Sequence, residues 1–219
     1  MRRALLFDLD GTLIDSDPLH LPVFVGMYAA RGRRIGHAYY MAHIHGRLNQ
    51  DSFAEAFPGE DPDALSEEKE RLFRARLGAS HPPMPGLPAF LDRAAGDGFA
   101  TAVVTNAPRE NAEAMLAATG LEGRFDTVVL AADCGRGKPD PAPYREALRR
   151  LGVPSAAAIA FEDSPSGLAA AVAAGVFAVG IRSSLGDAAL RAAGAAMTVK
   201  DFTDPALDSA LARLKGPVE

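Results

Sequence analysis

LLFDLDGTL, residues 5–13, joins a short apolar segment to a pair of aspartates and a glycine. The apolar residues are typical of a strand that is buried on both faces of a parallel sheet. Packing does not explain Asp8 and Asp10 at the end of such a strand, because a buried carboxylate costs free energy unless it is paired. In open α/β sheets, ligands bind at the carboxyl ends of the strands. We therefore predict that a catalytic site lies where this strand ends.

Short apolar segments alternate with helical segments along most of the chain. The predicted strands are residues 4–7, 101–104, 127–130, 158–161 and 176–181, with an edge strand at 196–199. The predicted helices are residues 109–119, 141–151 and 165–174, and each is followed by a glycine of the kind that ends helices. This alternation predicts an α/β fold with a Rossmann-like parallel sheet, covered on both faces by helices.

Residues 17–80 interrupt this alternation. They contain no convincing strand and are rich in charged residues and helix formers, and the proline-rich segment HPPMPG, residues 81–86, follows them as a stiff turn. We therefore expect two domains. Residues 1–16 and 81–219 form the catalytic core, and residues 17–80 form an inserted α-helical cap.

Composition excludes several classes of protein. The 219 residues carry a net charge of −5, which argues against nucleic acid as a partner, because binding to phosphate backbones requires a basic surface. Cys134 is the single cysteine, so an internal disulfide is excluded. The longest uncharged apolar segment, residues 167–181, is shorter than the ~20 residues that span a bilayer. We expect a cytoplasmic protein without a membrane partner, as a monomer or weak homodimer.

The aspartate pair allows two interpretations. In the structural one, Asp8 caps the following turn and Asp10 is solvated. In the chemical one, the two acids bind a hard cation, and one attacks an electrophile while the other transfers a proton. Two carboxylates this close together repel each other unless a cation lies between them, which favours the chemical interpretation. Gly11 allows a sharp turn directly after the acids.

Two further polar segments follow predicted strands or turns. Thr105 and Asn106 come directly after residues 101–104 and before a helix, where a hydroxyl, an amide and free N–H groups can bind phosphate. The alternative is that they are ordinary helix N-caps. Lys138 lies in the turn GRGKPDP, residues 135–141. It is either an exposed loop charge or the cation that bridges Asp8 and a phosphoryl group.

Glu162 and Asp163 end the predicted strand at residues 158–161. Asp163 and Ser164 can be explained as caps of the helix that starts at Pro165, which accounts well for Ser164 but leaves Glu162 without a partner. With Asp8 and the backbone carbonyl of Asp10, the two acids predict an all-oxygen metal site. Oxygen ligands and a phosphate substrate favour Mg²⁺ as the cofactor.

These four segments, in this order and spacing, resemble the signatures of the haloacid-dehalogenase-like (HAD) hydrolases. The resemblance spans nearly the whole chain and is greatest to the branch that includes phosphoglycolate phosphatase and β-phosphoglucomutase, whose members have a helical cap. It implies that Asp8 is the nucleophile that forms an aspartyl-phosphate and that Asp10 is the general acid and base. It also implies that Thr105, with Asn106 alongside, binds the transferring phosphoryl group.

The same resemblance assigns three residues of the predicted cap to substrate binding. His20 corresponds to a hinge histidine, and Lys69, with Phe73 one turn on, corresponds to a cap lysine and aromatic residue. The alternatives are a histidine on a helix surface and a solvated lysine that pairs with neighbouring glutamates. Asn49 stands where β-phosphoglucomutase has an arginine that grips the non-reacting phosphate. Its absence favours a hydrolase, which needs to grip one phosphate only.

The predicted function is hydrolysis of a small phosphate monoester, such as a sugar phosphate or phosphoglycolate, by a Mg²⁺-dependent phosphatase with an aspartyl-phosphate intermediate. The partner is therefore a small phosphorylated metabolite. A β-phosphoglucomutase-like phosphomutase is the alternative enzyme. A non-catalytic protein that binds phosphorylated metabolites is the alternative outside enzymes, since a fold does not determine a function.

Overall fold

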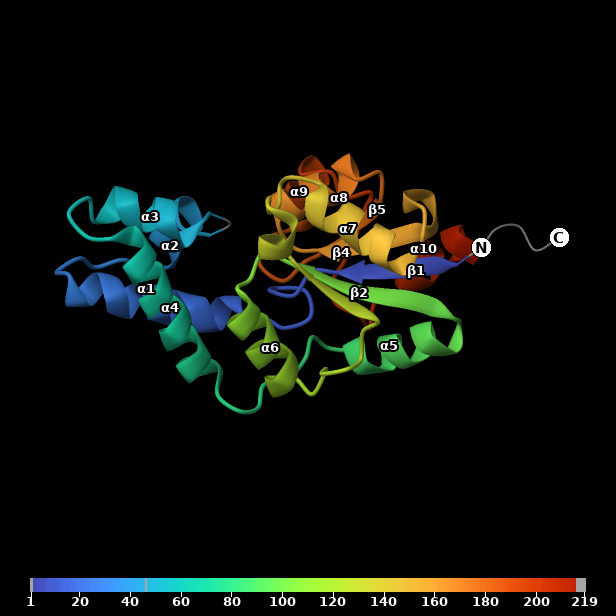
Figure 1. The fold of residues 1–219 in the computed structure, drawn as a ribbon, viewed down its shortest axis with the longest axis horizontal. Coiled ribbons are helices and arrows are strands. Elements are labelled where there is room, and N and C mark those ends of the chain that lie inside the picture. The colour runs from blue at the N-terminus through green and yellow to red at the C-terminus, as the bar shows by residue number, and fades with distance from the viewer. Residues whose placement is uncertain (1, 46, 216–219) are drawn as a thin grey trace. The chain divides into compact units, whose positions relative to one another are not determined.

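The computed structural model describes residues 2–45 and 47–215. The chain divides into two compact units, one formed by Met1–Asp15 with His81–Glu219 and the other by Ser16–Ser80. Among the described residues, all the strands of the sheet lie in the first unit, whereas the second is helical (Figure 1).

The first unit is built on a parallel sheet in the order β3-β2-β1-β4-β5-β6. Its strands are β1 (Arg3–Phe7), β2 (Phe99–Thr105), β3 (Thr127–Leu130), β4 (Ala158–Glu162), β5 (Phe177–Ile181) and β6 (Met197–Val199). This strand order is that of the Rossmann fold, and it confirms the predicted fold class. The order reverses between β1 and β4, and ligands bind beyond the carboxyl ends of strands at such a point.

The six predicted strands are all present, and only their ends differ from the prediction. Pairing of Thr105 with Leu130 extends β2, and pairing of Glu162 with Gly180 extends β4. Thr105 and Glu162 are therefore the last residues of their strands and not the first residues after them. Both side chains are held by a paired backbone at the carboxyl edge of the sheet.

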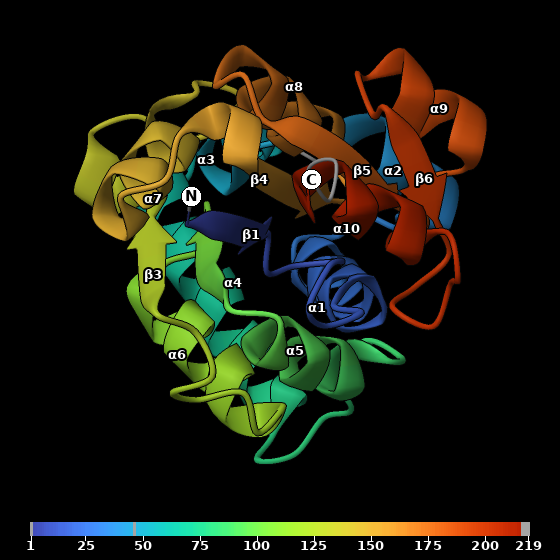
Figure 2. The same cartoon turned by 90° about the vertical axis from the view of Figure 1, so that its right-hand side faces the viewer.

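Helices cover both faces of this sheet (Figure 2). They are α5 (Leu87–Gly96), α6 (Arg109–Ala118), α7 (Ala142–Leu151), α8 (Pro165–Ala173), α9 (Asp187–Ala192) and α10 (Leu207–Lys215), with short 3₁₀ turns at Ala131–Cys134 and Ser155–Ala157. The helices predicted at residues 109–119, 141–151 and 165–174 are α6, α7 and α8. Gly152 directly follows α7 at φ 65°, the left-handed conformation that ends a helix.

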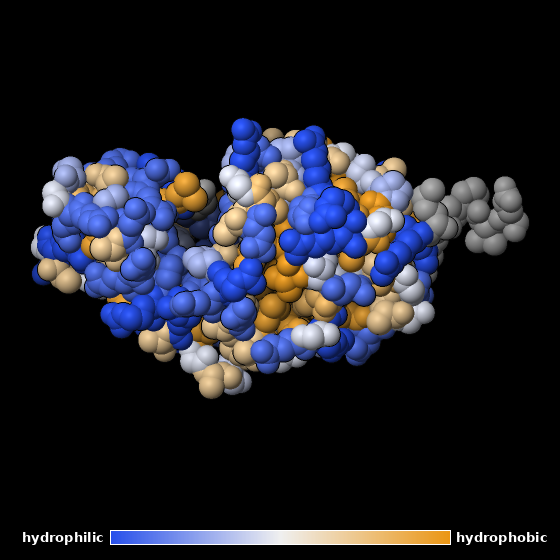
Figure 3. All heavy atoms as spheres, viewed as in Figure 1, coloured by the Kyte–Doolittle hydropathy of each residue, from blue (hydrophilic) through white to orange (hydrophobic). Residues whose placement is uncertain are grey.

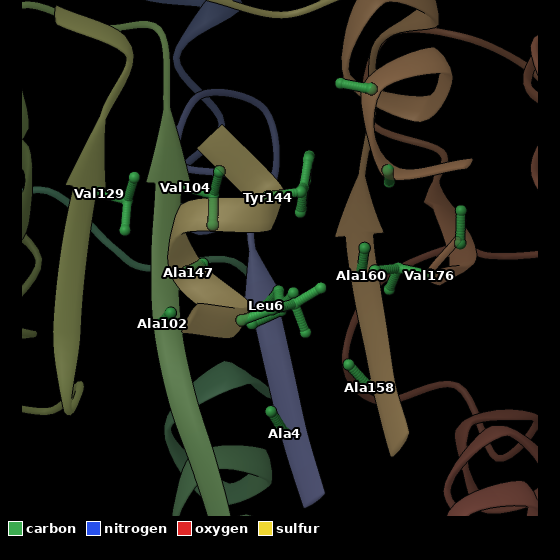
Figure 4. Close-up of a cluster of buried hydrophobic side chains, with 14 of the residues drawn as sticks. Ala4, Leu6, Ala102, Val104, Val129, Tyr144, Ala147, Ala158, Ala160 and Val176 are labelled. Atoms are coloured by element: carbon green, nitrogen blue, oxygen red, sulfur yellow. The ribbon is translucent and has the colours of Figure 1, made fainter. Parts of the chain in front are cut away.

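The two faces of the sheet have different cores. Under α7 and α8 the strands present mainly alanine and valine, with Leu6 and Tyr144 among the larger side chains (Figure 4). Small residues on the strands bring the helices close to the sheet. On the other face, Phe7 stacks on Phe161 with ring centroids 4.9 Å apart, and Phe90 of α5 packs edge-on against both rings.

The second unit packs four helices around its own aromatic core. They are α1 (Asp17–Ala30), α2 (His37–His43), α3 (Asn49–Ala56) and α4 (Pro62–Leu77) within the described part of the chain. Buried Phe24, Tyr28, Phe53 and Phe57 line the centre of this unit. A proline at the start of α4 and the side chain of Asp61, which accepts from the backbone N–H groups of residues 63 and 64, fix where that helix begins.

Hydrophilic residues cover much of the surface visible in Figure 3. Large hydrophobic side chains that are exposed in the described part of the chain are Leu48 and Val172. Across residues 2–45 and 47–215, no helix combines the length and the apolar character needed to cross a membrane.

Candidate active site

Three carboxylates gather at the point where the strand order reverses. Asp8, Glu162 and Asp163 are buried, and each offers an oxygen within 4.8 Å of the others. The sheet register explains the proximity: Phe7 pairs with Phe161, so the residues that follow emerge side by side. The Asp8 N–H continues the ladder by donating to the Phe161 carbonyl at 3.0 Å. The predicted convergence of these acids is therefore a feature of the sheet.

Lys138 lies between two of these acids. Its Nζ donates to Asp8 Oδ1 at 2.5 Å and to Glu162 Oε1 at 2.6 Å, and its side chain is buried. The interpretation as an exposed loop charge is therefore wrong, since the lysine is an internal cation. Arg136, two residues earlier in the same turn, is exposed and pairs with Asp140.

Asn106 holds the turn that carries Lys138. The Lys138 N–H donates to Asn106 Oδ1 at 2.9 Å, and Asn106 Nδ2 donates back to the Lys138 carbonyl at 3.1 Å. A Cβ on Gly137 would lie 2.9 Å from the same Oδ1, so this close approach requires glycine. Asn106 thus fixes Lys138 through the backbone of that lysine. Its predicted contact with phosphate stays a prediction.

Burial and charge set the protonation of the site. Burial, followed by the negative charge of Glu162, raises the pKa of Asp8 to about 8, although Lys138 opposes this shift. Burial alone would lower the pKa of Lys138, but the charges of Asp8 and Glu162 outweigh it and raise that pKa above its usual range. Lys138 therefore stays charged at neutral pH. One ammonium group balances one negative charge, so three carboxyl groups at this site favour a further cation once Asp8 is ionised.

Two glycines make room for the acids. Gly11 has a φ of 70°, and a Cβ there would lie 2.0 Å from Asp163 Oδ2. A Cβ on Gly167 would lie 1.9 Å from Glu162 Oε2. Each carboxylate is thus seated against bare backbone, which holds its oxygens in place. The all-oxygen donor set and this seating fit a hard divalent cation such as Mg²⁺.

Asp10 and Thr105 lie at the same edge of the sheet, outside the group of three acids. Asp10 is half-buried and forms a bridge with Ile14, and its charge contributes to the raised pKa of Asp8. Thr105 is buried at the end of β2, where its hydroxyl accepts from the N–H of Ala107 at 2.9 Å. The N-cap of α6 is Pro108, and no side chain caps that helix, so the alternative that Thr105 and Asn106 are its N-caps is wrong. The predicted roles of Asp10 in proton transfer and of Thr105 in phosphate binding stay predictions.

The structure places three further side chains against these acids: sequence reasoning missed Tyr144 and Ser183, whereas it expected Ser164 only as a helix cap, a role that the structure confirms. Tyr144 donates its hydroxyl to Glu162 Oε1 at 2.5 Å. Ser164 donates to Glu162 Oε2 and Ser183 donates to Asp163 Oδ2, both at 3.3 Å. Ser183 follows the end of β5, so the pattern of polar residues after strand ends could have indicated it. Tyr144 gave no such signal, because its position in α7 is that of a core residue.

The three predicted cap residues all lie in the helical unit. Lys69 donates to both carboxylate oxygens of Glu70, at 3.0 and 3.1 Å, and Asn49 Nδ2 donates to Glu70 Oε1 at 2.7 Å. The His20 ring stacks on Phe73 with centroids 4.2 Å apart. Lys69 is buried, so the alternative of a solvated charge is wrong, although its pairing with a neighbouring glutamate is right. Contact of these residues with substrate stays a prediction.

The fold and the acidic site together define an enzyme of the α/β class. The model of the haloacid dehalogenase-like hydrolases matches residues 2–175, and the chain belongs to that family. It is similar to the validoxylamine A 7'-phosphate phosphatase of Streptomyces hygroscopicus subsp. limoneus, with 32% identity over 93% of this chain and 96% of the relative. It is also similar to the phosphorylated carbohydrates phosphatase of Thermotoga maritima, with 33% identity over 90% and 94%.

Solved structures agree with this placement. A HAD hydrolase of family IA, variant 3, from Entamoeba histolytica matches with a TM-score of 0.89 at 27% identity, over 98% of this chain and 100% of that one. A phosphoglycolate phosphatase of Xylella fastidiosa is among the sequence relatives, and a putative β-phosphoglucomutase of Thermotoga maritima is among the similar structures. The resemblance found in the sequence is confirmed: the protein is a phosphoric monoester hydrolase in the branch that includes those two enzymes.

Proposed function

We propose that this protein is a Mg²⁺-dependent phosphatase that hydrolyses a small phosphate monoester through an aspartyl-phosphate on Asp8. The observation that carries the proposal is the position of Asp8, which belongs to the three-acid group and also accepts from Lys138. A nucleophile that must meet an anionic phosphate needs positive charge around it, and the lysine with a bound cation supplies that charge.

Asp8, Glu162 and Asp163 would hold the ion, together with the backbone carbonyl of Asp10. When bound, Mg²⁺ neutralises the charge of the phosphoryl oxygens and fixes their orientation. Hard carboxylate oxygens are the ligands that this ion prefers, and the acid group contains no nitrogen or sulfur donor among the described residues.

The residues of the chain then divide the reaction between them. A carboxylate oxygen of Asp8 attacks phosphorus in line, and the ester oxygen leaves with a proton from Asp10. In the second step Asp10 takes a proton from water, whose oxygen attacks the phosphorus of the aspartyl-phosphate. Inorganic phosphate is released and the Asp8 carboxylate is restored. Lys138 and Thr105 stabilise the charge that develops on the phosphoryl oxygens.

The proposed substrate is a sugar phosphate or a phosphoglycolate-like acid. Support comes from the relatives, whose names include a phosphorylated carbohydrates phosphatase, a fructose-1-phosphate phosphatase and a phosphoglycolate phosphatase. The cap supports a substrate with one phosphate. Asn49 stands at the position expected for a second phosphate grip, and its amide is bonded to Glu70.

The decisive experiment compares the wild-type protein with Asp8→Asn in phosphate release from p-nitrophenyl phosphate, with Mg²⁺ and with EDTA. We expect turnover in the wild type with Mg²⁺ only, and a loss of at least ~1,000-fold in the variant, because an amide cannot serve as the nucleophile. Near-normal turnover by Asp8→Asn would exclude the proposed intermediate. A screen of sugar phosphates and short-acid phosphates then identifies the best substrate.

A phosphomutase remains the second candidate because solved structures named putative β-phosphoglucomutase match at 26% identity. β-Glucose 1-phosphate, supplied with a bisphosphate primer, separates the two activities. A mutase forms glucose 6-phosphate, whereas a phosphatase forms glucose and inorganic phosphate. We expect the second outcome.

A further inference from the structure

We propose that Tyr144 is a positioning residue that orients Glu162 for metal binding and seats Lys138 beside Asp8. The inference deepens the proposed function, on which it rests for the role of the three acids. It concerns the core unit only, where all four side chains meet.

The hydroxyl of Tyr144 is placed where packing alone gives no reason for one. The residue is fully buried within a cluster of alanine, valine and leucine side chains (Figure 4). A phenylalanine would fill the same space without a polar atom. A buried hydroxyl costs free energy unless it forms a hydrogen bond, and here it donates to Glu162 Oε1 at 2.5 Å. The phenol is therefore explained by the carboxylate it contacts.

The contacts of Glu162 define its orientation completely. Oε1 accepts from both Tyr144 and Lys138, and Oε2 accepts from Ser164. The backbone of Gly167 closes the remaining side, because an added Cβ there would overlap both oxygens. Donors around a ligating carboxylate aim its free lone pairs at the metal. Without the Tyr144 hydroxyl, Oε1 is held only by Lys138, and the carboxylate can rotate toward the ammonium.

Tyr144 also contacts the lysine itself. The Lys138 Nζ lies 5.4 Å from the centroid of the Tyr144 ring, within the range of a cation–π contact. The ring therefore stabilises the ammonium, while the hydroxyl holds one of the two carboxylates that compete for it. The side chain of Tyr144 thus positions both members of the Lys138–Glu162 pair. Two substitutions separate the contribution of its hydroxyl from that of its ring.

The test uses the whole chain, freed of metal, and measures Mg²⁺ binding by isothermal titration calorimetry. Tyr144→Phe removes the hydroxyl and keeps the ring. We expect its Kd for Mg²⁺ to rise at least ~10-fold, as for other lost partners of metal ligands. At saturating Mg²⁺ we expect its kcat to stay within about threefold of the wild type, since the ring still seats Lys138. Tyr28→Phe, which removes a phenol oxygen buried in the helical unit, is the matched control, with an unchanged Kd.

Tyr144→Leu removes the ring as well. We expect kcat at saturating Mg²⁺ to fall about 10-fold below that of Tyr144→Phe, because the ammonium loses its aromatic contact. A Kd of Tyr144→Phe within twofold of the wild type would overturn the inference, whether or not Tyr144→Leu folds. The calorimetry does not depend on turnover. If the wild type releases no phosphate, the proposed function fails, while the Kd still decides the role of Tyr144.

Discussion

Phe7 lies opposite Phe161 in the register of β1 and β4, and their rings stack on one face of the sheet. Successive side chains of a strand point to opposite faces, so Asp8 and Glu162 point to the other face, toward α7. There they meet Lys138 and Tyr144. The register of β1 and β4 thus places an aromatic pair on one side of the sheet and a carboxylate pair on the other.

Phe161→Ala tests how much the aromatic face contributes to stability. Phe161 is fully buried, and the rings of Phe7, Phe90 and Phe202 pack around it. We expect a loss of about 3–5 kcal/mol in the free energy of unfolding, because the cavity cannot be refilled. Urea denaturation measures this loss. The exposed Val172→Ala is the control, and a change in it as large as in Phe161→Ala would contradict the explanation.

Much of this arrangement could be predicted from sequence, because carboxyl ends of parallel strands share one edge of a sheet. Polar residues after apolar segments therefore indicated that Asp8, Glu162 and Asp163 converge, and the structure brings them together. The strand centres were predicted correctly, whereas the last residues of β2 and β4 were not. Those ends depend on pairing with β3 and β5, which lie far along the chain.

The rest of the site depends on contacts that sequence spacing does not encode. Tyr144 occupies an inward-facing position of an amphipathic helix, where a core residue is the ordinary expectation. Asn106 and Lys138 are joined across 32 positions by a pair of side chain–backbone bonds. Glu70, which binds both Lys69 and Asn49 in the helical unit, looked like one of several surface glutamates. Each of these contacts becomes apparent only in the tertiary structure.

Lys138→Met is expected to destabilise the metal-free protein and to remove activity. Without the ammonium, Asp8 and Glu162 are buried together with no cation between them. Breaking a buried pair costs about 3–5 kcal/mol, and loss of one charge-stabilising donor lowers kcat about 100-fold or more. Thermal unfolding and phosphate release measure the two effects, and saturating Mg²⁺ should recover part of the stability.

Arg136→Met is the matched control for that prediction. Arg136 is an exposed basic residue of the same turn, paired with Asp140 on the surface. Its removal should change stability by less than about 1 kcal/mol and leave kcat unchanged. Equal effects of the two substitutions would show that the turn tolerates no change, and the role of Lys138 as the internal cation would have no support.

Mg²⁺ binding should depend on pH through Asp8. In the metal-free protein the pKa of Asp8 is raised to about 8, so below pH 8 its carboxyl is mostly protonated, and a metal must displace that proton. The Kd for Mg²⁺ should therefore fall by up to ~10-fold per unit as pH rises from 6 to 8, and level off above 8. Calorimetry in buffers of different ionisation enthalpy measures the released proton. A Kd that is constant over this range would contradict the shifted pKa.

Gly11→Ala and Gly123→Ala separate backbone strain from damage to the site. Both glycines have φ near 70°, so each alanine costs about 1–2 kcal/mol of stability for its left-handed backbone. Around Gly123 an added Cβ meets open space, whereas at Gly11 it would overlap the carboxylate of Asp163. We expect Gly11→Ala to displace Asp163 and raise the Kd for Mg²⁺ at least ~10-fold beyond that of Gly123→Ala, as for a lost or misplaced metal ligand. If calorimetry gives the two variants the same Kd, the prediction that Asp163 binds the ion is contradicted.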